Sequence, residues 1–504
     1  MKLADLIEGV EVGRVSGEVA QEISGLSYDS RRTQPGDLFF ATARDPQAAR
    51  SHIEQALNRG ARAVVVKGWD GEARSAATII ECERPRILMG VAASRFFRVP
   101  SRALDLVGIT GTSGKTTTTY LLRSIFEAAG RGAAIIGTIG IFAGERKLSS
   151  GLTTPESIDL ESALDTLRRE GVTAVAAEIS SIGLEERRVD ELSFRACLFT
   201  NLGRDHLDYH GTVENYFAAK LRLFSELLPR SAHPDAVAVV NGDDPYGRVV
   251  LANVRGAKIS FGRGANHDAR VIDATIGADG IEAALEVCGR RFKLRSPLLG
   301  EINLRNILGA SALSVALGIE TDAVVEGVRR CPGAPGRLEA VPGPPGVKVL
   351  VDYAHKPDAL LAVLEALRAL KPRRLICVFG CGGDRDRGKR PLMGEIAGRL
   401  ADLPIITSDN PRSEEPRRIM DEIEAGMVTT ALKRIDPRQA RIRPGYLTEP
   451  DRRAAIALAL RTAVAGDFVL IAGKGHEDYQ LIGDRRLAFD DRAVVRELTA
   501  AMGA

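Results

Sequence analysis

The stretch Val107-Gly-Ile-Thr-Gly-Thr-Ser-Gly-Lys-Thr-Thr117 joins an apolar run to a helical pattern through a glycine-rich loop. Apolar residues crowd positions 104–109, which favours a buried strand, and they recur with helical spacing over 120–129. A glycine loop between a strand and a helix lets backbone N–H groups turn inward around an anion, and the helix N-terminus adds its positive end. An accidental glycine turn is the alternative, and the two flanking elements count against it.

The loop therefore predicts a site for ATP or a similar nucleotide. Lys115 can reach the outer phosphates, and the hydroxyl of Thr116 can hold Mg²⁺. The residues expected to surround the phosphate chain are Gly111, Thr112, Ser113, Gly114, Lys115, Thr116 and Thr117.

Length and composition fit a soluble protein of several domains. The chain has 504 residues, of which 44% are hydrophobic and 27% charged, and its formal net charge is +3. A chain of this length predicts about two to four domains. So weak a charge does not favour a nucleic-acid or membrane partner, and no apolar run approaches the ~18 residues of a membrane span. The six cysteines are scattered, which favours free thiols in a reducing cytoplasm.

Helix-breaking residues divide the chain into three predicted α/β domains, at residues 1–100, 101–332 and 333–504. Pro100 ends the first domain, and the proline- and glycine-rich stretch 331–346 is expected to form a hinge before the third. In the second and third domains, strand patterns alternate with helical ones, which is typical of parallel sheets covered by helices. These strands are predicted at 106–110, 134–139, 172–179, 195–201, 348–353, 374–379, 403–407 and 467–472.

Polar side chains follow several of these strands, at the edge of a parallel sheet where ligands gather. In the second domain, Glu178 directly follows an apolar strand and suits a hard cation such as Mg²⁺. His206 could contribute, although hydrogen bonding within its polar turn is an equally good interpretation. Lys220 lies on a predicted helix, where a solvated lysine is the ordinary expectation.

In the third domain, polar clusters follow four successive strands, and together they predict a binding crevice. Each cluster alone could be a solvated turn. The clusters lie at 352–355, 382–391, 408–416 and 473–479.

The order of these motifs resembles that of the Mur ligases, in particular the members that add the third residue of the peptidoglycan stem peptide. The motifs span all three predicted domains, and the segment 205–211 and the two C-terminal motifs are highly specific. The matching segments are 29–31, 111–117, 153–155, 178–181, 200–211, 352–355, 409–412 and 473–477.

The resemblance implies an enzyme with a small α/β N-terminal UDP-binding domain, a central P-loop ATPase domain with a parallel sheet, and a Rossmann-like C-terminal domain for an amino acid. ATP would phosphorylate the terminal carboxylate of UDP-MurNAc-L-Ala-D-Glu, and the amine of the incoming amino acid would attack the acyl phosphate. The protein would act by positioning and charge neutralisation. We expect a cytoplasmic monomer whose partners are these small molecules, without nucleic acid or membrane.

The resemblance also implies catalytic roles. Lys115 would hold the transferred phosphoryl group, and Thr116, Glu178 and His206 would surround Mg²⁺. Lys220, by resemblance alone, would be an N6-carboxylysine whose added carboxylate helps to hold a second Mg²⁺. The positions that match residues near the nucleotide are Asn303, Arg337 and Asp352.

On the acceptor side, the matching residues are Tyr28, Ser30, Thr153, Thr154, Ser180, Glu186 and Arg188. Ser30 and Arg31 precede a turn that could bind an anion or simply lie at the surface. Glu186 replaces the usual Gln, and a carboxylate near an anionic substrate needs a cation beside it, for which we expect Arg187 or Arg188. The other departures from the family pattern are Ser113, Ile182, Lys356 and the segment 42–51.

The third amino acid is expected to be meso-diaminopimelate. Asp409-Asn-Pro-Arg412 is the form found in Mur ligases that add this residue, and Arg412 can grip its far carboxylate with a planar guanidinium. L-lysine would instead place a cation against Arg412, which like-charge repulsion disfavours. The residues expected around the amino acid are Arg385, Asp409, Asn410, Pro411, Arg412, Gly473 and Glu477.

Two alternatives stay open. A related Mur-type ligase could join an altered acceptor or a different third amino acid, and the departures at Ile182 and Glu186 motivate this hypothesis. A P-loop ATPase that forms no bond would share the glycine loop, but it would have no need of a second crevice around Arg412.

Overall fold

The computed structural model describes residues 1–69, 77–149 and 151–503. The chain forms two compact units. The first holds residues 1–271, 285–292 and 308–327, and the second holds residues 272–284, 293–307 and those from 328 onward. The predicted α/β class is confirmed in both units, whereas the predicted domain boundaries at residues 100 and 332 stay predictions.

A small sheet lies in the N-terminal part of the first unit. Its strand order is β1-β5-β4-β3-β2, with β2 to β5 parallel and β1 antiparallel to β5. These strands are β1 (Val15–Ser16), β2 (Gly25–Ser27), β3 (Asp37–Phe40), β4 (Ala63–Val66) and β5 (Thr78–Glu81).

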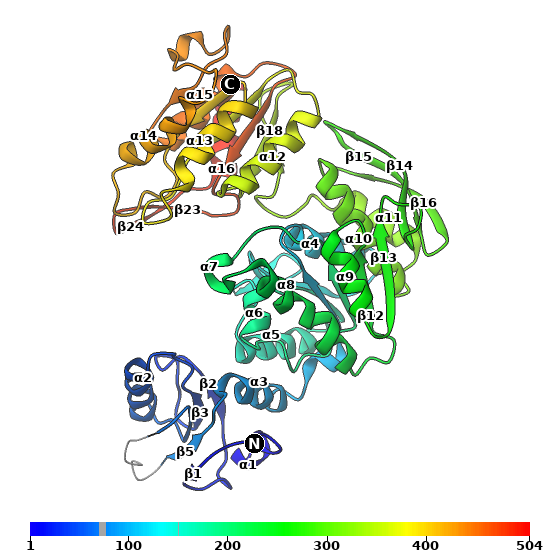
Figure 1. Cartoon of the computed structure of the whole chain (residues 1–504), viewed down its shortest axis with the longest axis vertical. Helices are drawn as coiled ribbons and strands as arrows, with labels where there is room; N and C mark the ends of the chain where they lie inside the picture. The colour runs from blue at the N-terminus through cyan, green and yellow to red at the C-terminus, as the bar shows by residue number, and fades with distance from the viewer. Residues whose placement is uncertain (70–76, 150, 504) are drawn as a thin grey trace. The chain divides into compact units, whose positions relative to one another are not determined.

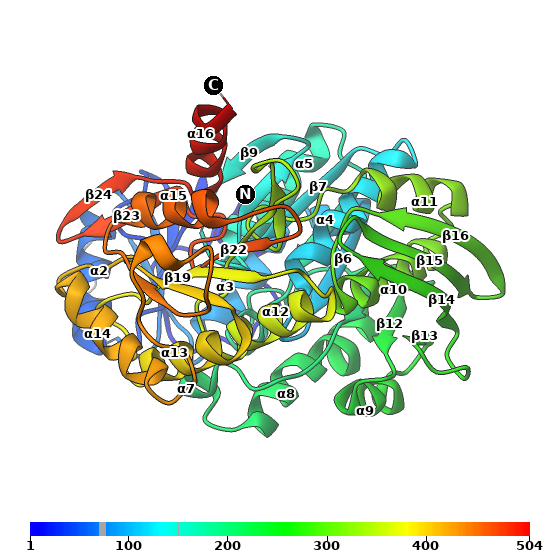
Figure 2. The same ribbon diagram turned by 90° about the horizontal axis from the view of Figure 1, so that it is seen from above.

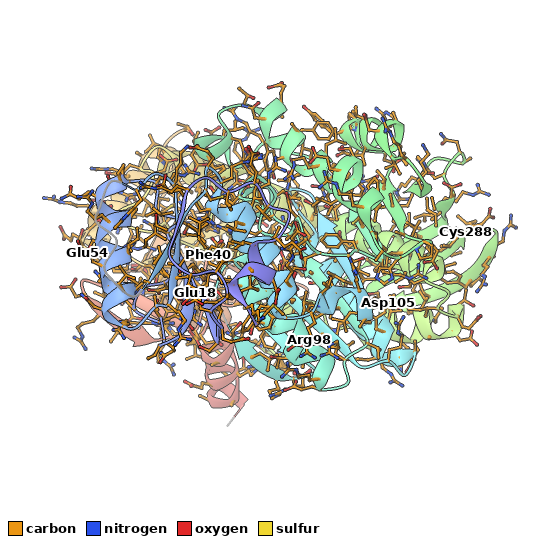
Figure 3. The ribbon with its side chains drawn as sticks, turned by 90° about the horizontal axis from the view of Figure 1, so that it is seen from below. Glu18, Phe40, Glu54, Arg98, Asp105 and Cys288 are labelled. Carbon is orange, nitrogen blue, oxygen red and sulfur yellow. The ribbon has the colours of Figure 1, made fainter. Side chains whose placement is uncertain are left out.

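Helices α2 (Pro46–Asn58) and α3 (Pro85–Phe96) flank this sheet on opposite sides (Figure 1). Phe39 packs in the cluster that contains residues of α2, and Phe40 packs in the cluster that contains residues of α3. Successive strand residues point to opposite faces, which explains the division. Figure 3 shows Phe40 among the strands and Glu54 on α2.

Strand β6 (Asp105–Thr110) leads into the glycine loop and lies inside the large central sheet. Its two neighbours, β10 (Ala174–Glu178) and β11 (Ala196–Phe199), run parallel to it. The carboxyl ends of parallel strands meet at one edge of a sheet, so the glycine loop, Glu178 and the segment after Phe199 come together. The helices that follow include α4 (Lys115–Ala128), α5 (Ser157–Arg169), α6 (Ser181–Glu185), α7 (Leu207–His210) and α8 (Val213–Arg222).

The central sheet extends beyond the predicted strands on both sides. Its described order is β16-β15-β14-β13-β12-β11-β6-β10-β7-β8-β9. The prediction missed several outer strands, because many of their side chains are exposed and their apolar patterns are weak. It also missed the strand Val237–Asn241, although all of its residues are buried. The strands not yet given are β7 (Ala133–Gly137), β8 (Gly140–Ala143), β9 (Arg146–Ser149), β12 (Val237–Asn241), β13 (Ala257–Gly262), β14 (Ala269–Gly277), β15 (Gly280–Val287) and β16 (Arg290–Ser296).

The second unit holds a sheet of order β17-β18-β22-β19-β20-β21, in which β18 to β21 are parallel. Four of its strands confirm the predicted ones: β18 (Lys348–Asp352), β19 (Leu375–Phe379), β20 (Leu403–Ile406) and β22 (Phe468–Ala472). The short strands β17 (Glu339–Val341) and β21 (Leu447–Thr448) complete the sheet, and a separate hairpin is formed by β23 (Tyr479–Ile482) and β24 (Arg485–Ala488).

Helices cover both faces of this sheet, as a doubly wound fold requires. Side chains of α12 (Pro357–Ala369), α13 (Lys389–Leu400) and α14 (Pro416–Met427) pack in one core cluster. Side chains of α15 (Arg452–Thr462) and α16 (Asp491–Gly503) pack in the other. Figure 2 shows α12 and α13 on one side of β19 and β22, and α15 on the opposite side.

All six cysteines are free, as expected. Among the described helices, none combines the length and the apolar character that a membrane crossing requires.

Candidate active site

The glycine loop is shaped by two residues with positive φ angles, Gly111 at 144° and Gly114 at 88°. A Cβ atom on Gly111 would lie 1.9 Å from the Thr200 hydroxyl oxygen, so only glycine fits there. Thr200 comes from the end of β11, and its hydroxyl donates to the Ser113 carbonyl at 2.7 Å. The neighbouring strand therefore holds the loop in a form that can cradle a phosphate chain.

Two lysines converge on this loop. Lys115 Nζ donates to the carbonyls of Gly111 and Thr112 at 2.8 and 3.0 Å, and Lys220 Nζ donates to the Gly111 carbonyl at 2.9 Å. Lys220 is only 1% exposed, so the expectation of a solvated lysine is wrong. Burial, and then the charge of Lys115, lowers the pKa of Lys220 well below its ordinary value. The site thus contains a buried amine whose neutral form is favoured more than that of a solvated lysine.

Glu178 lies at the end of β10 and is suited to hold Mg²⁺. Its side chain is 2% exposed and accepts hydrogen bonds from the backbone N–H and hydroxyl of Thr138, at 3.0 and 3.1 Å. The described residues contain no group of three or more His, Cys, Asp or Glu side chains that could hold a metal by themselves. Carboxylate and hydroxyl oxygens fit Mg²⁺, which usually completes its shell with phosphate and water, so Glu178 and Thr116 fit such an ion.

His206 is half-exposed, and Tyr216 connects it to the glycine loop. Its backbone is left-handed, with φ of 53°. The His206 and Tyr216 rings have centroids 6.1 Å apart, and Lys220 Nζ lies 4.6 Å from the Tyr216 ring. The Tyr216 hydroxyl is 3.1 Å from the Thr112 hydroxyl. Tyr216 carried no functional signal in the sequence, because a helical aromatic residue is usually a core residue.

The residues predicted for the acceptor include a connected group around Thr154. The Thr154 hydroxyl donates to the Glu178 carbonyl and accepts from the Ser180 N–H, both at 2.9 Å. Arg188 donates to the Thr154 carbonyl at 3.1 Å. The Thr153 hydroxyl lies 3.1 Å from the threonine hydroxyl that binds Glu178. The structure therefore brings these residues together at the carboxyl end of β10.

Glu186 is paired with two arginines from the N-terminal part of the chain. Its carboxylate lies 2.5 Å from Arg44 Nη2 and 2.8 Å from Arg86 Nε, and it accepts a hydrogen bond from the Tyr209 hydroxyl at 2.5 Å. Burial raises the pKa of Glu186, but the Tyr209 hydrogen bond and the charges of Arg86 and Arg44 outweigh burial, so the pKa lies below its ordinary value. The ionised form of Glu186 is thus favoured, and Arg44 and Arg86 compensate its negative charge.

The prediction that Arg187 or Arg188 compensates Glu186 is wrong. Arg187 pairs with Asp190 at 3.1 Å, and Arg188 pairs with Glu156 at 3.0 Å. Both arginines follow the short helix α6 and already have acidic partners of their own. Sequence proximity was a poor guide because the tertiary fold supplies the cations from another segment.

The remaining acceptor-side residues lie in the turn that follows β2 of the small N-terminal sheet. The Tyr28 hydroxyl donates to Asp159 on α5. Ser30 is 4% exposed, and its hydroxyl donates to Gln55 Oε1 on α2 at 2.8 Å. Arg31 pairs with Asp29 at 2.7 Å. An anion site at Ser30 and Arg31 stays a prediction.

Asp352, at the end of β18, is a buried carboxylate fixed by two backbone amides. It accepts from the N–H groups of Leu338 and Ala354 at 2.7 and 2.8 Å. Burial raises the pKa of Asp352, and the charge of Arg337 opposes that rise. The Arg337 guanidinium lies 4.8 Å from the Tyr353 ring centroid. Arg337 and Asp352 are therefore neighbours, as their predicted shared role requires.

Asn303 and Asn306 are three residues apart and lie on one face of α10 (Glu301–Ala316). Asn306 Nδ2 donates to Asn303 Oδ1 at 3.0 Å, and Asn303 Nδ2 donates to the Leu299 carbonyl at 2.9 Å. Both side chains are buried. The pair is ordered, whereas the role of Asn303 near a nucleotide stays a prediction.

The residues predicted for the amino acid gather at the carboxyl ends of β20 and β22. Asn410 Nδ2 donates to Glu477 Oε2 at 2.9 Å. A Cβ atom on Gly473 would lie 3.5 Å from Asp409 Oδ2, so Gly473 and Asp409 are close. Burial raises the pKa of Glu477, and Lys474 opposes the rise.

Arg385 lies in the loop after β19, and Arg412 contacts the same loop from the loop after β20. Arg412 Nη1 donates to the Gly383 carbonyl at 2.8 Å. A Cβ atom on Gly382 would lie 2.9 Å from Arg412 Nη1 and 3.8 Å from Arg385 Cγ. Arg412 has a left-handed backbone with φ of 53°, a conformation that costs a non-glycine residue roughly 1–3 kcal/mol. Such strain persists only where the surroundings hold it.

Lys474 is a central residue of this cluster that the sequence analysis did not single out. It is fully buried, and its Nζ donates to Asn410 Oδ1 at 3.0 Å. It also lies 3.4 Å from Asp409 Oδ1 and 3.6 Å from Glu477 Oε2. Its position inside the Gly473–Glu477 motif was the available signal, but only the fold shows that it points inward.

Comparisons with known proteins agree with this geometry. Models of two domains match the chain, the Mur ligase middle domain over residues 109–314 and the Mur ligase glutamate ligase domain over residues 336–475. The chain is 44% identical over 496 residues to the UDP-N-acetylmuramoyl-L-alanyl-D-glutamate–2,6-diaminopimelate ligase of Geobacter sulfurreducens, covering 98% of this chain and 97% of that one. It is 43% identical over 505 residues to the ligase of the same name from Solibacter usitatus, covering 100% and 99%.

Solved structures give the same result. A structure of a UDP-N-acetylmuramoyl-L-alanyl-D-glutamate–2,6-diaminopimelate ligase matches with a TM-score of 0.72 and 33% identity, covering 100% of this chain and 99% of that one. The fold is also shared with the MurF ligase from Thermotoga maritima in complex with ADP, with a TM-score of 0.60 and 20% identity over 95% and 96% of the two chains. With relatives this similar over its whole length, the chain belongs to the Mur ligase family.

Proposed function

We propose that this chain is an ATP-dependent, ADP-forming ligase that joins meso-2,6-diaminopimelate to UDP-MurNAc-L-Ala-D-Glu, in the cytoplasmic synthesis of the peptidoglycan precursor. The similarity to ligases of this specificity covers the full chain. The observation in the structure that carries the proposal is the placement of Arg412 and Arg385 beside Gly382. Asp409 lies in the same loop as Arg412, and Glu477, in the loop after β22, is joined to that loop through Asn410 and Lys474. Such a site offers cations to a carboxylate and carboxylates to an ammonium, which are the groups at each end of diaminopimelate.

The first step transfers the γ-phosphoryl group of ATP to a carboxylate oxygen of the acceptor glutamate. The bond from the γ-phosphorus to the bridging oxygen of ADP breaks as the bond to the carboxylate oxygen forms. Lys115 neutralises the transferred group, and the backbone N–H groups of the glycine loop hold the phosphate chain. Mg²⁺ bound by Thr116 and Glu178 would neutralise phosphate oxygens further.

The second step forms the amide bond. The neutral amine of diaminopimelate attacks the acyl carbon, the carbon–oxygen bond to phosphate breaks, and the amine loses a proton. Arg412 and Arg385 would hold the far carboxylate, while Asp409 and Glu477 would hold the far ammonium. This chain's contribution is orientation, because the acyl phosphate is reactive once an amine is correctly placed.

We further propose that Lys220 is an N6-carboxylysine. Its nitrogen adds to the carbon of CO₂ and releases a proton, which requires a neutral amine, and the burial of Lys220 lowers its pKa in that direction. The resulting carboxylate would sit beside the Gly111 carbonyl and add an oxygen ligand for a second Mg²⁺. His206 would complete the surroundings of the ions, and Asn303, Arg337 and Asp352 would contact the nucleotide.

The compensation of Glu186 bears on the hypothesis of an altered acceptor. An unpaired carboxylate at this position would repel an anionic substrate, but Arg44 and Arg86 neutralise it. Glu186 therefore gives no electrostatic reason to exclude UDP-MurNAc-L-Ala-D-Glu. We expect the enzyme to act as a monomer.

One assay tests the proposal. Purified protein with ATP and Mg²⁺ is given UDP-MurNAc-L-Ala-D-Glu together with meso-diaminopimelate, with L-lysine, or with no amino acid, and phosphate release and the tripeptide product are measured. We expect both only with diaminopimelate. Equal phosphate release without an amino acid would show an ATPase, and product with L-lysine at the same rate would overturn the assigned specificity.

A further inference from the structure

The hairpin β23–β24 pairs with the loop that is proposed to hold the third amino acid. Arg412 N–H donates to the Leu481 carbonyl at 3.0 Å, and Gly483 N–H donates to the Arg412 carbonyl at 2.7 Å. These bonds form a parallel bridge between Arg412 and Ile482. The hairpin lies below α13 and α14 in the view of Figure 1.

Side-chain contacts extend this pairing to the start of the loop. Gln480 is 8% exposed, and its Nε2 donates to the Asp409 carbonyl at 2.8 Å. Leu481 N–H donates to Asn410 Oδ1 at 3.0 Å. Each residue of β23 from Gln480 to Ile482 therefore engages one of the loop residues Asp409, Asn410 or Arg412.

Lys474 forms hydrogen bonds with both the hairpin and the loop. Its Nζ donates to Asn410 Oδ1 at 3.0 Å and to the Tyr479 carbonyl at 2.6 Å. Asn410 Oδ1 thus accepts from two donors, which directs Asn410 Nδ2 towards Glu477 Oε2. The direction of the Asn410 amide is a consequence of the hairpin and Lys474.

The hairpin also explains how Arg412 keeps its strained backbone. A non-glycine residue with φ of 53° in a free loop would relax to a negative φ, and its guanidinium would turn away. The two backbone hydrogen bonds to β23 and the following glycine hold Arg412 on both sides. In the held conformation its guanidinium reaches the Gly383 carbonyl, next to Arg385.

We propose that the β23–β24 hairpin is the element that positions the amino-acid site, with Gln480 on β23 and Lys474, which precedes the hairpin, as the positioning residues. This proposal rests on the proposed binding of diaminopimelate at Asp409–Arg412. Gln480 acts through the loop backbone and Lys474 acts through Asn410 and Glu477. Selection of diaminopimelate over L-lysine therefore depends on a hairpin that is not part of the recognised motifs.

The test uses Gln480→Met in the full-length enzyme, because methionine keeps the length of the side chain and removes its amide donor. We expect the KM for diaminopimelate to rise about tenfold, as the loss of one buried hydrogen bond allows. The KM values for ATP and for UDP-MurNAc-L-Ala-D-Glu should change less than about twofold, and the preference in kcat/KM for diaminopimelate over L-lysine should fall. Arg485→Gln, at an exposed position of β24, is the matched control and should behave as wild type.

A double-mutant comparison separates positioning from general stability. If Gln480 acts through the loop, Gln480→Met combined with Arg412→Ala should reduce kcat/KM for diaminopimelate no further than Arg412→Ala alone, within about twofold. A Gln480→Met enzyme with a lower Tm but an unchanged KM for diaminopimelate would overturn the inference while the proposed function stands. An unchanged KM in Arg412→Ala would instead remove the loop from the amino-acid site, and the inference would fail with it.

Discussion

Lys115 and Lys220 donate hydrogen bonds to the same acceptor, the backbone carbonyl of Gly111, at 2.8 and 2.9 Å. Two ammonium groups on one carbonyl repel each other, and burial penalises the charge of Lys220 most. Burial, and then the charge of Lys115, therefore shifts Lys220 towards its neutral form. A neutral amine next to a phosphate-binding loop is what carbamylation requires.

Lys220→Ala tests the proposed carbamate directly. We expect kcat to fall by about 100-fold or more, because a charge that holds the reacting groups is removed from a buried site. Acetate or another short carboxylate added to this variant should restore part of the activity by occupying the vacated space. Lys220→Arg is the control, since it keeps a cation, fills the space and should not respond to acetate. Wild-type activity in Lys220→Ala, or a folded variant that acetate does not rescue, would contradict the carbamate.

Arg44→Ala should remove one of the two cations that compensate the charge of Glu186. Arg44 is 80% exposed at its side chain, so the loss should be modest, with a rise of about 2- to 10-fold in the KM for UDP-MurNAc-L-Ala-D-Glu. Arg86 still pairs with Glu186 in Arg44→Ala, so the carboxylate is only partly compensated there. In Arg44→Ala combined with Glu186→Gln this carboxylate is gone, and the KM should return to within about twofold of wild type. Arg14→Ala, which removes another exposed arginine from an ion pair, with Glu81, serves as the control. A KM that Glu186→Gln fails to restore would show that Arg44 acts otherwise.

Arg412→Ala and Arg412→Gly separate the charge of Arg412 from its backbone. Both remove the guanidinium, and both should raise the KM for diaminopimelate by about 30-fold or more while ATP binding is kept, as expected for a lost charge-assisted hydrogen bond of about 2 kcal/mol. Glycine also relieves the positive φ of 53°, so Arg412→Gly should be more stable than Arg412→Ala by about 1 kcal/mol. Steady-state kinetics and urea unfolding measure the two effects. Equal stability of the two variants would mean that the backbone at this position is not strained in solution.

Glu161 on α5 should make folding stability fall as the pH rises. Burial, and then the negative charge of Glu191, raises the pKa of Glu161 from 4.5 to about 8. Between pH 4.5 and about 8, Glu161 is protonated in the folded state but ionised in the unfolded chain. The stabilisation that this bound proton gives the folded state is therefore fully present below pH 4.5. It is lost as the pH rises towards 8, by at most about 1.4 kcal/mol per pH unit.

The variant Glu161→Gln should remove this dependence. Its Tm should exceed that of wild type at pH 8 and approach it at pH 5. Glu54→Gln, at an exposed position on α2 (Figure 3), is the control and should leave the pH profile unchanged. A wild-type Tm that rises steadily from pH 5 to pH 8, with Glu161→Gln parallel to it, would contradict a protonated Glu161.

The local patterns of the sequence were sufficient for the elements that carry the site. The run before Gly111 forms β6, the helical pattern after it forms α4, and the polar clusters lie at the ends of parallel strands as predicted. Strand and helix periodicity depend on neighbours a few residues apart, which a single sequence displays. The resemblance to the Mur ligases rested on the same short segments.

The tertiary structure alone decided which charges meet. Glu186 pairs with Arg44, 142 residues away, and not with the adjacent arginines. Gln480 reaches Asp409 across 71 residues, and Lys474 reaches Asn410 across 64. Local periodicity predicts neither the partner of a charged side chain nor its burial, because both depend on which distant segments the fold packs against that side chain.

At the glycine loop, the local sequence is sufficient to define the strand, the turn and the helix around Lys115. Only the tertiary structure placed Lys220 against the same carbonyl and removed it from water. The physical reason is that a backbone turn follows from the conformational freedom of its own glycines, whereas the pKa of a lysine follows from everything packed around it.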